Sequence, residues 1–144
     1  MITIGNRKFY HAKICINGHV SDANLESLSK LNEFCGVCGR ITITQCKNCN
    51  TSIRGWPYNP HIGIAMAFKP LNFCLSCGAQ FPWTKAKIEA IKELIDFEIK
   101  LSDNDKKIMK KNIKDLIIET PRTGTASKKF KYGLTKMTKE VMPN

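Results

Sequence analysis

The C-terminal part of the chain shows apolar residues at helical spacing. Five of them fall on one predicted helix face: Ile88, Ile91, Leu94, Ile95 and Ile99. The string Phe81-Pro82-Trp83-Thr84 before them resembles a helix start, with Thr84 as the N-cap. Trp83 and Ile88 are then placed to pack on each other as a hydrophobic staple. We therefore predict a first helix that begins at residue 84.

Two further helices are predicted after it. The string Ser102-Asp103-Asn104-Asp105 is a candidate capping box, and it precedes a second apolar stripe that ends before Pro121: Met109, Ile113, Leu116 and Ile117. A third stripe has mostly four-residue spacing: Ala126, Phe130, Leu134, Met137 and Val141. Gly133 lies inside this third segment and should weaken it.

The first 83 residues have a different composition. They contain all seven cysteines, and between Cys15 and Cys77 they offer few of the large aliphatic residues that build a core. Such a segment needs disulfides or metal ions to stabilise it. We predict a small α+β protein with a double zinc-ribbon domain at residues 1–83 and a basic helical tail at residues 84–144.

The cellular compartment decides between disulfides and metal. Basic residues (Arg7, Lys8 and Lys13) interrupt the N-terminal segment, so it contains no apolar core of a signal peptide. No apolar run approaches the roughly 20 residues of a membrane span. We therefore expect a cytoplasmic protein without a membrane partner, in which cysteine pairs are metal ligands rather than disulfides.

Cysteines with metal-ligand spacing occur three times, as Cys35/Cys38, Cys46/Cys49 and Cys74/Cys77. A two-residue gap lets both sulfur atoms face one ion. Each pair is followed by a residue that tolerates a positive φ: Gly39, Asn50 or Gly78. Cys15 and His19, joined by a loop that contains Asn17-Gly18, form a fourth pair. These eight ligands predict two structural zinc ions.

Spacing alone leaves the grouping of the ligands open. The segment between Cys38 and Cys46 is suited to a short hairpin, so we expect Cys35, Cys38, Cys46 and Cys49 to share one ion. The other four ligands would then close a second site: Cys15, His19, Cys74 and Cys77. The alternative is a cross-brace that pairs Cys15/His19 with Cys46/Cys49. His11 or His61 could also take the place of His19.

Several strings together resemble a known family: HAKICINGHV, FCGVCGRITITQCKNC, SIRGW, FCLSCGAQFPWTKAK and ETPRTGTASKKFK. They are similar to a family of bacterial zinc-ribbon proteins that is catalogued only as a domain of unknown function. The resemblance covers roughly residues 10–132. It implies that Cys15, His19 and the six paired cysteines are the metal ligands, and it implies no activity.

No catalytic arrangement is apparent in the sequence. Eight ligands for two ions leave no open coordination position, and no acidic residue flanks the cysteine pairs as a general base would. The sequence has neither a Gly-rich phosphate loop nor a nucleophile elbow. We predict that the protein is not an enzyme and has no small-molecule substrate.

Two kinds of macromolecular partner remain. The net charge is +11, and seven thiolates with two Zn²⁺ ions would lower it to about +8. Cations and aromatic residues near the cysteine pairs, with lysines of the tail, are candidates for contacts with unpaired bases or with a partner: Arg40, Arg54, Trp56, Tyr58, His61, Lys128, Lys129 and Lys131. The apolar run at residues 62–68 is a candidate contact edge for a protein. The sequence favours a protein-interaction adaptor marginally over a nucleic-acid-binding protein.

Overall fold

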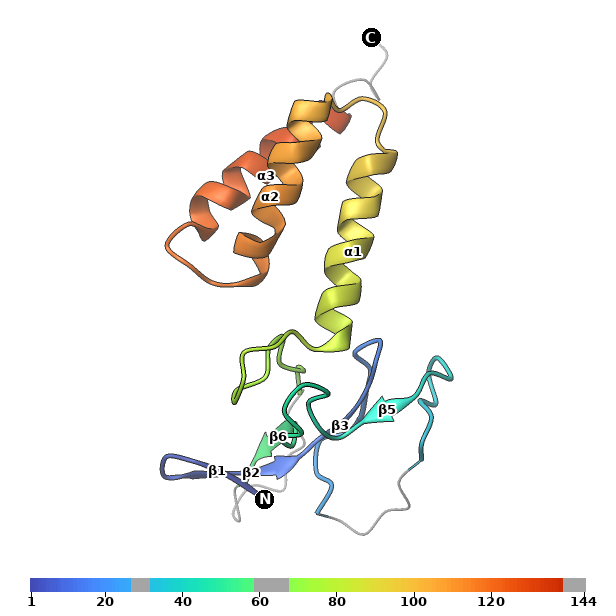
Figure 1. The fold of residues 1–144 in the computed structure, drawn as a ribbon, viewed down its shortest axis with the longest axis vertical. Helices are drawn as coiled ribbons and strands as arrows, with labels where there is room; N and C mark the ends of the chain where they lie inside the picture. Colours follow the sequence, from blue (N-terminus) through green and yellow to red (C-terminus); the bar gives the residue numbers. More distant parts are fainter. Residues whose placement is uncertain (27–31, 59–67, 139–144) are drawn as a thin grey trace. The chain divides into compact units, whose positions relative to one another are not determined.

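The computed structural model describes residues 1–26, 32–58 and 68–138. The chain is a small α+β protein, as predicted, with two small antiparallel sheets followed by three helices (Figure 1). It divides into two compact units, Met1–Lys85 and Ala86–Asn144. All the strands in the described residues belong to the first unit.

Each sheet has three short strands. The first has the order β1-β2-β6, from Ile2–Ile4, Arg7–His11 and Arg54–Pro57. The second has the order β4-β3-β5, from Val20–Asp22, Lys13–Cys15 and Thr42–Ile43. Only the fully buried Ala12 separates β2 from β3. One continuous stretch of chain therefore supplies the middle strand of both sheets.

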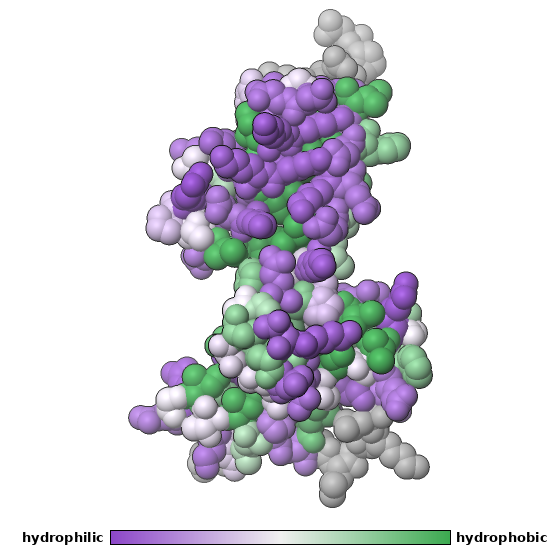
Figure 2. All heavy atoms as spheres, in the orientation of Figure 1, coloured by the Kyte–Doolittle hydropathy of each residue, from purple (hydrophilic) through white to green (hydrophobic). Residues whose placement is uncertain are grey.

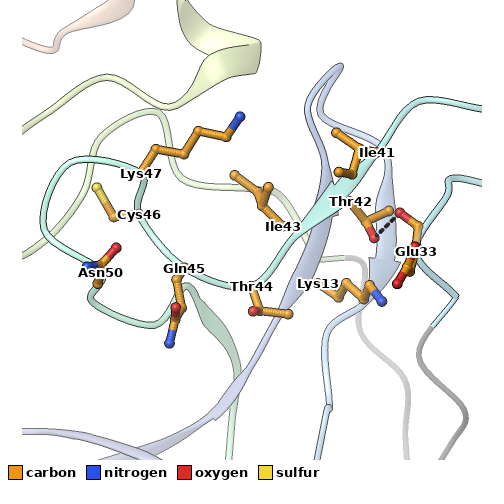
Figure 3. A pocket seen from close by; sticks show the side chains of 10 residues that line it. All are labelled: Lys13, Glu33, Ile41, Thr42, Ile43, Thr44, Gln45, Cys46, Lys47 and Asn50. Carbon is orange, nitrogen blue, oxygen red and sulfur yellow. Dashed lines mark hydrogen bonds between the residues drawn. The ribbon is translucent and has the colours of Figure 1, made fainter.

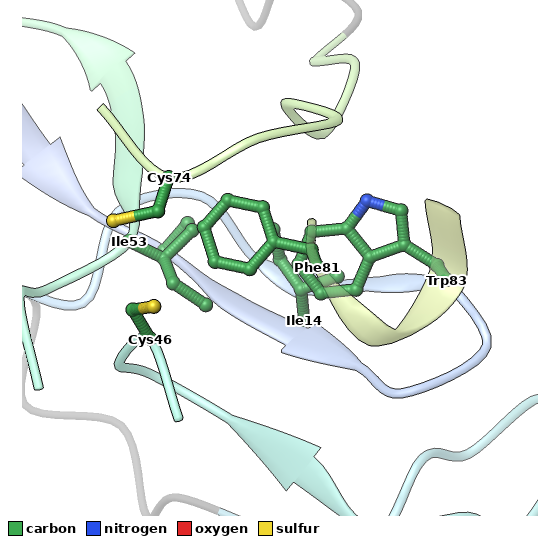
Figure 4. Close-up of a cluster of buried hydrophobic side chains, with 7 residues drawn as sticks. Ile14, Cys46, Ile53, Cys74, Phe81 and Trp83 are labelled. Atoms are coloured by element: carbon green, nitrogen blue, oxygen red, sulfur yellow. The ribbon is translucent and has the colours of Figure 1, made fainter. Parts of the chain in front are cut away.

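The core of the first unit contains metal-ligand candidates as well as ordinary apolar side chains (Figure 4). Its buried members are Ala12, Ile14, Cys46, Ile53, Cys74, Phe81 and Trp83. The rings of Phe81 and Trp83 are stacked, with centroids 4.6 Å apart. The Trp83 indole N–H donates to the carbonyl of Leu71 at 2.9 Å, so the tryptophan is buried without leaving its polar atom unpaired.

The first helix begins earlier than the sequence indicated. Helix α1 spans Pro82–Phe97, so its first residue is a proline, which is favoured at that position because it has no N–H to leave unpaired. Thr84 is buried inside the helix, and its hydroxyl donates to the Asn72 carbonyl at 2.8 Å. The predicted N-cap at Thr84 is therefore wrong, because a tertiary contact uses the hydroxyl.

The apolar stripe of this helix is only partly buried. Ile88 and Ile95 lie in the core of the second unit, whereas Leu94 is 67% exposed. Ile99, which is 91% exposed, lies beyond the end of the helix at Phe97. The predicted helix face therefore extends too far toward the C-terminus.

The second and third helices agree better with their sequence signals. Helix α2 spans Asp103–Ile117, and Ser102 is its N-cap, as predicted: its hydroxyl oxygen accepts from the Asp105 N–H at 3.2 Å. Helix α3 spans Thr123–Thr138. The core that these helices share with α1 contains Ile88, Ile95, Leu101, Met109 and Ile113.

The surface of the helical unit carries both hydrophobic and hydrophilic side chains. Figure 2 shows hydrophobic patches between hydrophilic ones on one face of this unit. Within the described residues, no helix is both long and apolar enough to cross a membrane.

Candidate metal centres

The three Cys-x-x-Cys turns have one common backbone geometry. In the first, the Cys35 N–H donates to the Arg40 carbonyl and the Gly39 N–H donates to the Cys35 carbonyl, both at 2.8 Å. The turns that begin at Cys46 and Cys74 repeat both bonds at equivalent positions. The residues that leave the turns have positive φ angles, as predicted: 67° at Gly39, 58° at Asn50 and 69° at Gly78. Each turn is therefore a zinc knuckle in its local geometry.

The fourth pair lies in the tight connection between β3 and β4. The Cys15 N–H donates to the His19 carbonyl at 2.8 Å, and the Gly18 N–H donates to the Cys15 carbonyl at 2.7 Å. Gly18 has a φ of 90°, a conformation that favours glycine. This turn directs the side chains of Cys15 and His19 toward the same site.

The eight candidate ligands form two groups of four. One contains Cys15, His19, Cys35 and Cys38; the other contains Cys46, Cys49, Cys74 and Cys77. Within each group all the ligand atoms lie within 4.8 Å of one another. We call these groups the first and the second tetrad.

Both groupings expected from the sequence are wrong. The stretch between Cys38 and Cys46 does not form the expected hairpin between its two knuckles; instead β5 pairs with β3, with Ile43 opposite Ile14 and Thr42 opposite Cys15. This pairing places the Cys35/Cys38 knuckle beside the Cys15–His19 turn. Cys46 and Cys49 are then left to meet Cys74 and Cys77, and the two tetrads follow each other along the chain.

The dimensions of both tetrads fit a tetrahedral metal ion. Four sulfur atoms at 2.3 Å from one ion would lie about 3.8 Å apart. In the second tetrad the Sγ atoms of Cys46 and Cys77 are 3.8 Å apart, and those of Cys49 and Cys74 are 3.6 Å apart. In the first, Cys15 and Cys38 approach to 3.4 Å, and Cys35 Sγ lies 3.7 Å from His19 Nδ1.

An asparagine supports each tetrad in the same way. The Asn17 N–H donates to Cys15 Sγ at 3.3 Å, and its side-chain amide donates to Cys38 Sγ at 3.6 Å. Asn48 makes the equivalent bonds to Cys46 at 3.4 Å and to Cys77 at 3.5 Å. Such outer donors fix the ligand orientation and stabilise thiolate charge. The sequence signal was the shared Cys-x-Asn string, which our sequence analysis missed.

The two tetrads also share one pattern of burial. Cys15, Cys35, Cys46 and Cys74 are buried, whereas Cys38 and Cys77, which accept the asparagine amides, are exposed. Each tetrad therefore has one side against the protein interior and one side toward solvent.

The surroundings shift the pKa values of two thiols in the second tetrad, Cys49 and Cys74, in opposite directions. Hydrogen bonding with the Thr51 side chain, whose Oγ1 lies 3.3 Å from Cys49 Sγ, lowers the pKa of Cys49 to about 6. Burial raises the pKa of Cys74 to about 11. Since metal ligands must be thiolates, Cys74 would lose its proton when a cation binds.

The other histidines are not part of these groups. His11 Nδ1 lies 3.3 Å from a carboxylate oxygen of Glu26 and belongs to neither tetrad. His61 and most of the apolar run at residues 62–68 lie outside the described residues. Among the described histidines, His19 is therefore the candidate ligand.

The candidate contact residues near the tetrads pack largely on their neighbours. The Arg54 guanidinium lies over the Phe9 ring, 4.8 Å from its centroid, and the Tyr58 ring meets Tyr10 edge-on. Trp56 is half-buried. Arg40 is exposed, as are Lys128, Lys129 and Lys131 on α3 in the other unit.

An open pocket of about 540 Å³ adjoins β5 and extends to the second tetrad (Figure 3). Its lining includes the buried Lys13, the exposed Lys47 and the ligand candidate Cys46. The Thr42 hydroxyl in its wall donates to the Glu33 carbonyl at 2.9 Å.

The fold and the two tetrads define a small α+β protein whose cysteine clusters are consistent with zinc ribbons. Residues 8–144 match a family described as "Uncharacterized protein conserved in bacteria (DUF2321)", and the chain belongs to this family. That description names no activity. No curated protein and no solved structure matches the chain.

Proposed function

We propose that this protein is a non-enzymatic module stabilised by two structural zinc ions and that it acts as a protein-interaction adaptor. The observation that carries the zinc assignment is the repeated construction of the two tetrads. Each has four ligand atoms at the separation of a tetrahedral site, and each has one asparagine that donates to two of its sulfur atoms.

The ligand chemistry favours zinc over other common ions. Tetrahedral groups rich in thiolate select Zn²⁺ or iron–sulfur chemistry, whereas Mg²⁺ and Ca²⁺ prefer oxygen ligands. A group of three cysteines and one histidine is typical of structural zinc. Since both tetrads share one construction, we assign the same metal to both.

The closed ligand sets support a structural role. A catalytic zinc ion keeps one coordination position for water or substrate, and structural sites use four protein ligands. Each tetrad offers four, including two buried cysteines. Cys46 and Cys74 are also members of the apolar core, so the bound ion would hold together the elements that carry this core.

Exposed apolar side chains around the first tetrad support the adaptor role. Phe34 and Ile41 face each other across a β-bridge at the base of the Cys35/Cys38 knuckle, and Val37 lies within the knuckle. They are 60%, 48% and 75% exposed, respectively. Exposed apolar side chains that are close together favour contact with another protein. By contrast, the contacts of Arg54 with Phe9 and of Tyr58 with Tyr10 leave fewer free faces for stacking on bases.

Native mass spectrometry tests the zinc assignment, and we expect two zinc ions per chain.

The adaptor role is tested by capturing the tagged protein, with whatever is bound to it, from a bacterium that carries the gene. The capture is done with and without nuclease. We expect a nuclease-resistant protein partner that the double variant Phe34→Ser/Val37→Ser loses. Leu75→Ser is the matched control, because Leu75 is an equally exposed residue (59%) on a knuckle of the second tetrad. Capture that nuclease abolishes and that weakens steeply with salt would instead indicate nucleic-acid binding.

A further inference from the structure

A groove of about 360 Å³ lies between α2 and α3 in the helical unit. Its lining residues are Asp105, Ile108, Met109, Lys128, Lys129, Tyr132 and Gly133. The floor depends on a close approach of the two helices, because a Cβ atom on Gly133 would collide with the Met109 side chain. Gly133 therefore leaves room for the Met109 side chain between the two helices, although the sequence indicated only that it would weaken the helix.

The walls of the groove are apolar and accessible. Ile108 is 38% exposed and Tyr132 is 64% exposed. The Lys136 ammonium lies 4.9 Å from the centroid of the Tyr132 ring, so a cation occupies part of the aromatic surface. Apolar walls above a methionine floor form a site for a bulky apolar side chain rather than for a polar one.

The charges at the groove are unbalanced. Lys128 and Lys129 are exposed, and neither forms an ion pair with any residue that the structure describes. Asp105, the acidic residue of the lining, accepts from Lys136 at 2.8 Å and from the Ser102 hydroxyl at 2.7 Å. The charge that remains available to a ligand is therefore positive.

We propose that this groove binds an acidic amphipathic segment of a partner protein. An apolar side chain of the segment would enter between Ile108 and Tyr132, and its carboxylates would face Lys128 and Lys129. Apolar contact supplies affinity in such a site, and complementary charge supplies specificity and rapid association. This inference rests on the adaptor role proposed above, but it concerns the other unit of the chain.

Two other occupants fit the observations less well. A second copy of this chain also carries a strongly positive net charge, +11 before metal binding, so like charges oppose self-association. The two unpaired lysines could contact the phosphates of a nucleic acid, but the apolar floor of the groove offers it no polar contact. In addition, the Lys136 ammonium over the Tyr132 ring competes with base stacking. The acidic amphipathic segment satisfies both the apolar and the basic part of the groove.

The probe is a fluorescein-labelled peptide of about 16 residues with Leu at i, i+3, i+4 and i+7 spacing and Glu elsewhere. It is titrated into the full-length zinc-loaded protein and followed by fluorescence anisotropy. We expect saturable binding that weakens about tenfold with Tyr132→Ser and about tenfold with the double variant Lys128→Gln/Lys129→Gln. Only the lysine variant should also reduce the salt dependence.

Matched controls separate the groove from the general charge of the helix. Lys131 is exposed on α3 but does not line the groove, so Lys131→Gln should leave binding within about twofold of the original. Phe97→Ser removes a highly exposed aromatic residue outside the groove and should have no effect. A peptide with Ser in place of Leu, and one with Lys in place of Glu, should both fail to bind.

The outcomes distinguish this inference from the proposed function. If the peptide does not bind, or if Lys131→Gln weakens it as much as the groove variants do, the groove proposal is overturned. The groove proposal would also be overturned, in favour of nucleic acid, if a single-stranded oligonucleotide bound more tightly than the acidic peptide and lost this binding in the Tyr132→Ser variant. Two zinc ions and a partner lost in the Phe34→Ser/Val37→Ser variant would still support the proposed function in either case.

Discussion

Gly18 lies against Trp83 so closely that a Cβ atom on Gly18 would stand 3.0 Å from the Trp83 Cβ. Gly18 belongs to the turn that carries Cys15 and His19, and Trp83 lies in the first turn of α1. The contact joins one ligand loop of the first tetrad to the core that contains Cys46 and Cys74 of the second. The ligand loop of the first tetrad therefore packs on the same core that contains two ligand candidates of the second.

We expect Gly18→Ala to destabilise the first unit. Gly18 has a φ of 90°, and a side chain in left-handed backbone costs about 1–2 kcal/mol before the contact with Trp83 is counted. Chemical denaturation of the zinc-loaded protein measures the change. Gly36→Ala is the control, because Gly36 lies in the same tetrad's knuckle and a Cβ atom there would have no neighbour within 4 Å. Equal stability of the two variants would contradict the role given to the Gly18–Trp83 contact.

The asparagine donors should affect their own tetrads separately. Asn17→Ala removes the amide that donates to Cys38, and Asn48→Ala removes the one that donates to Cys77. We expect each change to weaken zinc binding about 10- to 100-fold at one site. Competition with a chelator, followed by mass spectrometry, measures the affinities. Each variant is the control for the other, and a loss at both sites in either variant would be inconsistent with independent support.

Pairs of serine variants distinguish the observed ligand grouping from a zinc ribbon built on Cys35–Cys49. Cys15→Ser/Cys38→Ser changes a single tetrad, so we expect one zinc ion to remain bound. Cys38→Ser/Cys49→Ser changes one ligand in each tetrad, and we expect both sites to be lost or severely weakened. Native mass spectrometry of freshly purified protein gives the stoichiometry. The grouping by ribbon predicts the reverse result for the two pairs.

The sequence was sufficient to identify the metal-ligand candidates because their signal is local. A Cys-x-x-Cys turn, its exit residue and the Asn-Gly turn are each encoded within a few positions, and the positive φ angles at Gly39, Asn50 and Gly78 were predicted correctly. The Ser102 cap of α2 was correct for the same reason, since the hydroxyl and the N–H it contacts are three residues apart.

Features that depend on distant contacts could not be predicted in this way. The grouping of the ligands follows from the pairing of β5 with β3, between segments almost 30 residues apart, for which the alternating pattern around Ile43 gave no partner. The hydroxyl of Thr84 had a plausible local role as a cap, but the Asn72 carbonyl accepts its hydrogen bond instead. In both cases tertiary packing overrode a reasonable local interpretation.

The ion pair between Asp105 and Lys136 predicts a titration that the sequence does not suggest. The Lys136 ammonium donates to the Asp105 carboxylate at 2.8 Å, and this hydrogen bond is the main reason that the pKa of Asp105 lies below its ordinary value of 3.8. The same bond raises the pKa of Lys136 above 10.5. The pair connects the first turn of α2 to the last turns of α3.

The signs of the two shifts define the pH range in which the pair stabilises the helical unit. Because the folded pKa of Asp105 is depressed, its contribution is present above pH 3.8 and is lost as the pH falls through the folded value. Because the folded pKa of Lys136 is raised, its contribution is present below pH 10.5 and is lost as the pH rises through the folded value.

Carbon-13 NMR of the Asp105 carboxyl group measures the pKa of Asp105 directly. We expect Lys136→Gln to move this titration upward toward 3.8, with part of the depression retained because the Ser102 hydroxyl still donates to the carboxylate. Lys131→Gln removes the same charge from α3 without touching Asp105 and should leave the titration unchanged. An Asp105 pKa that does not respond to Lys136→Gln would show that the pair does not persist in solution.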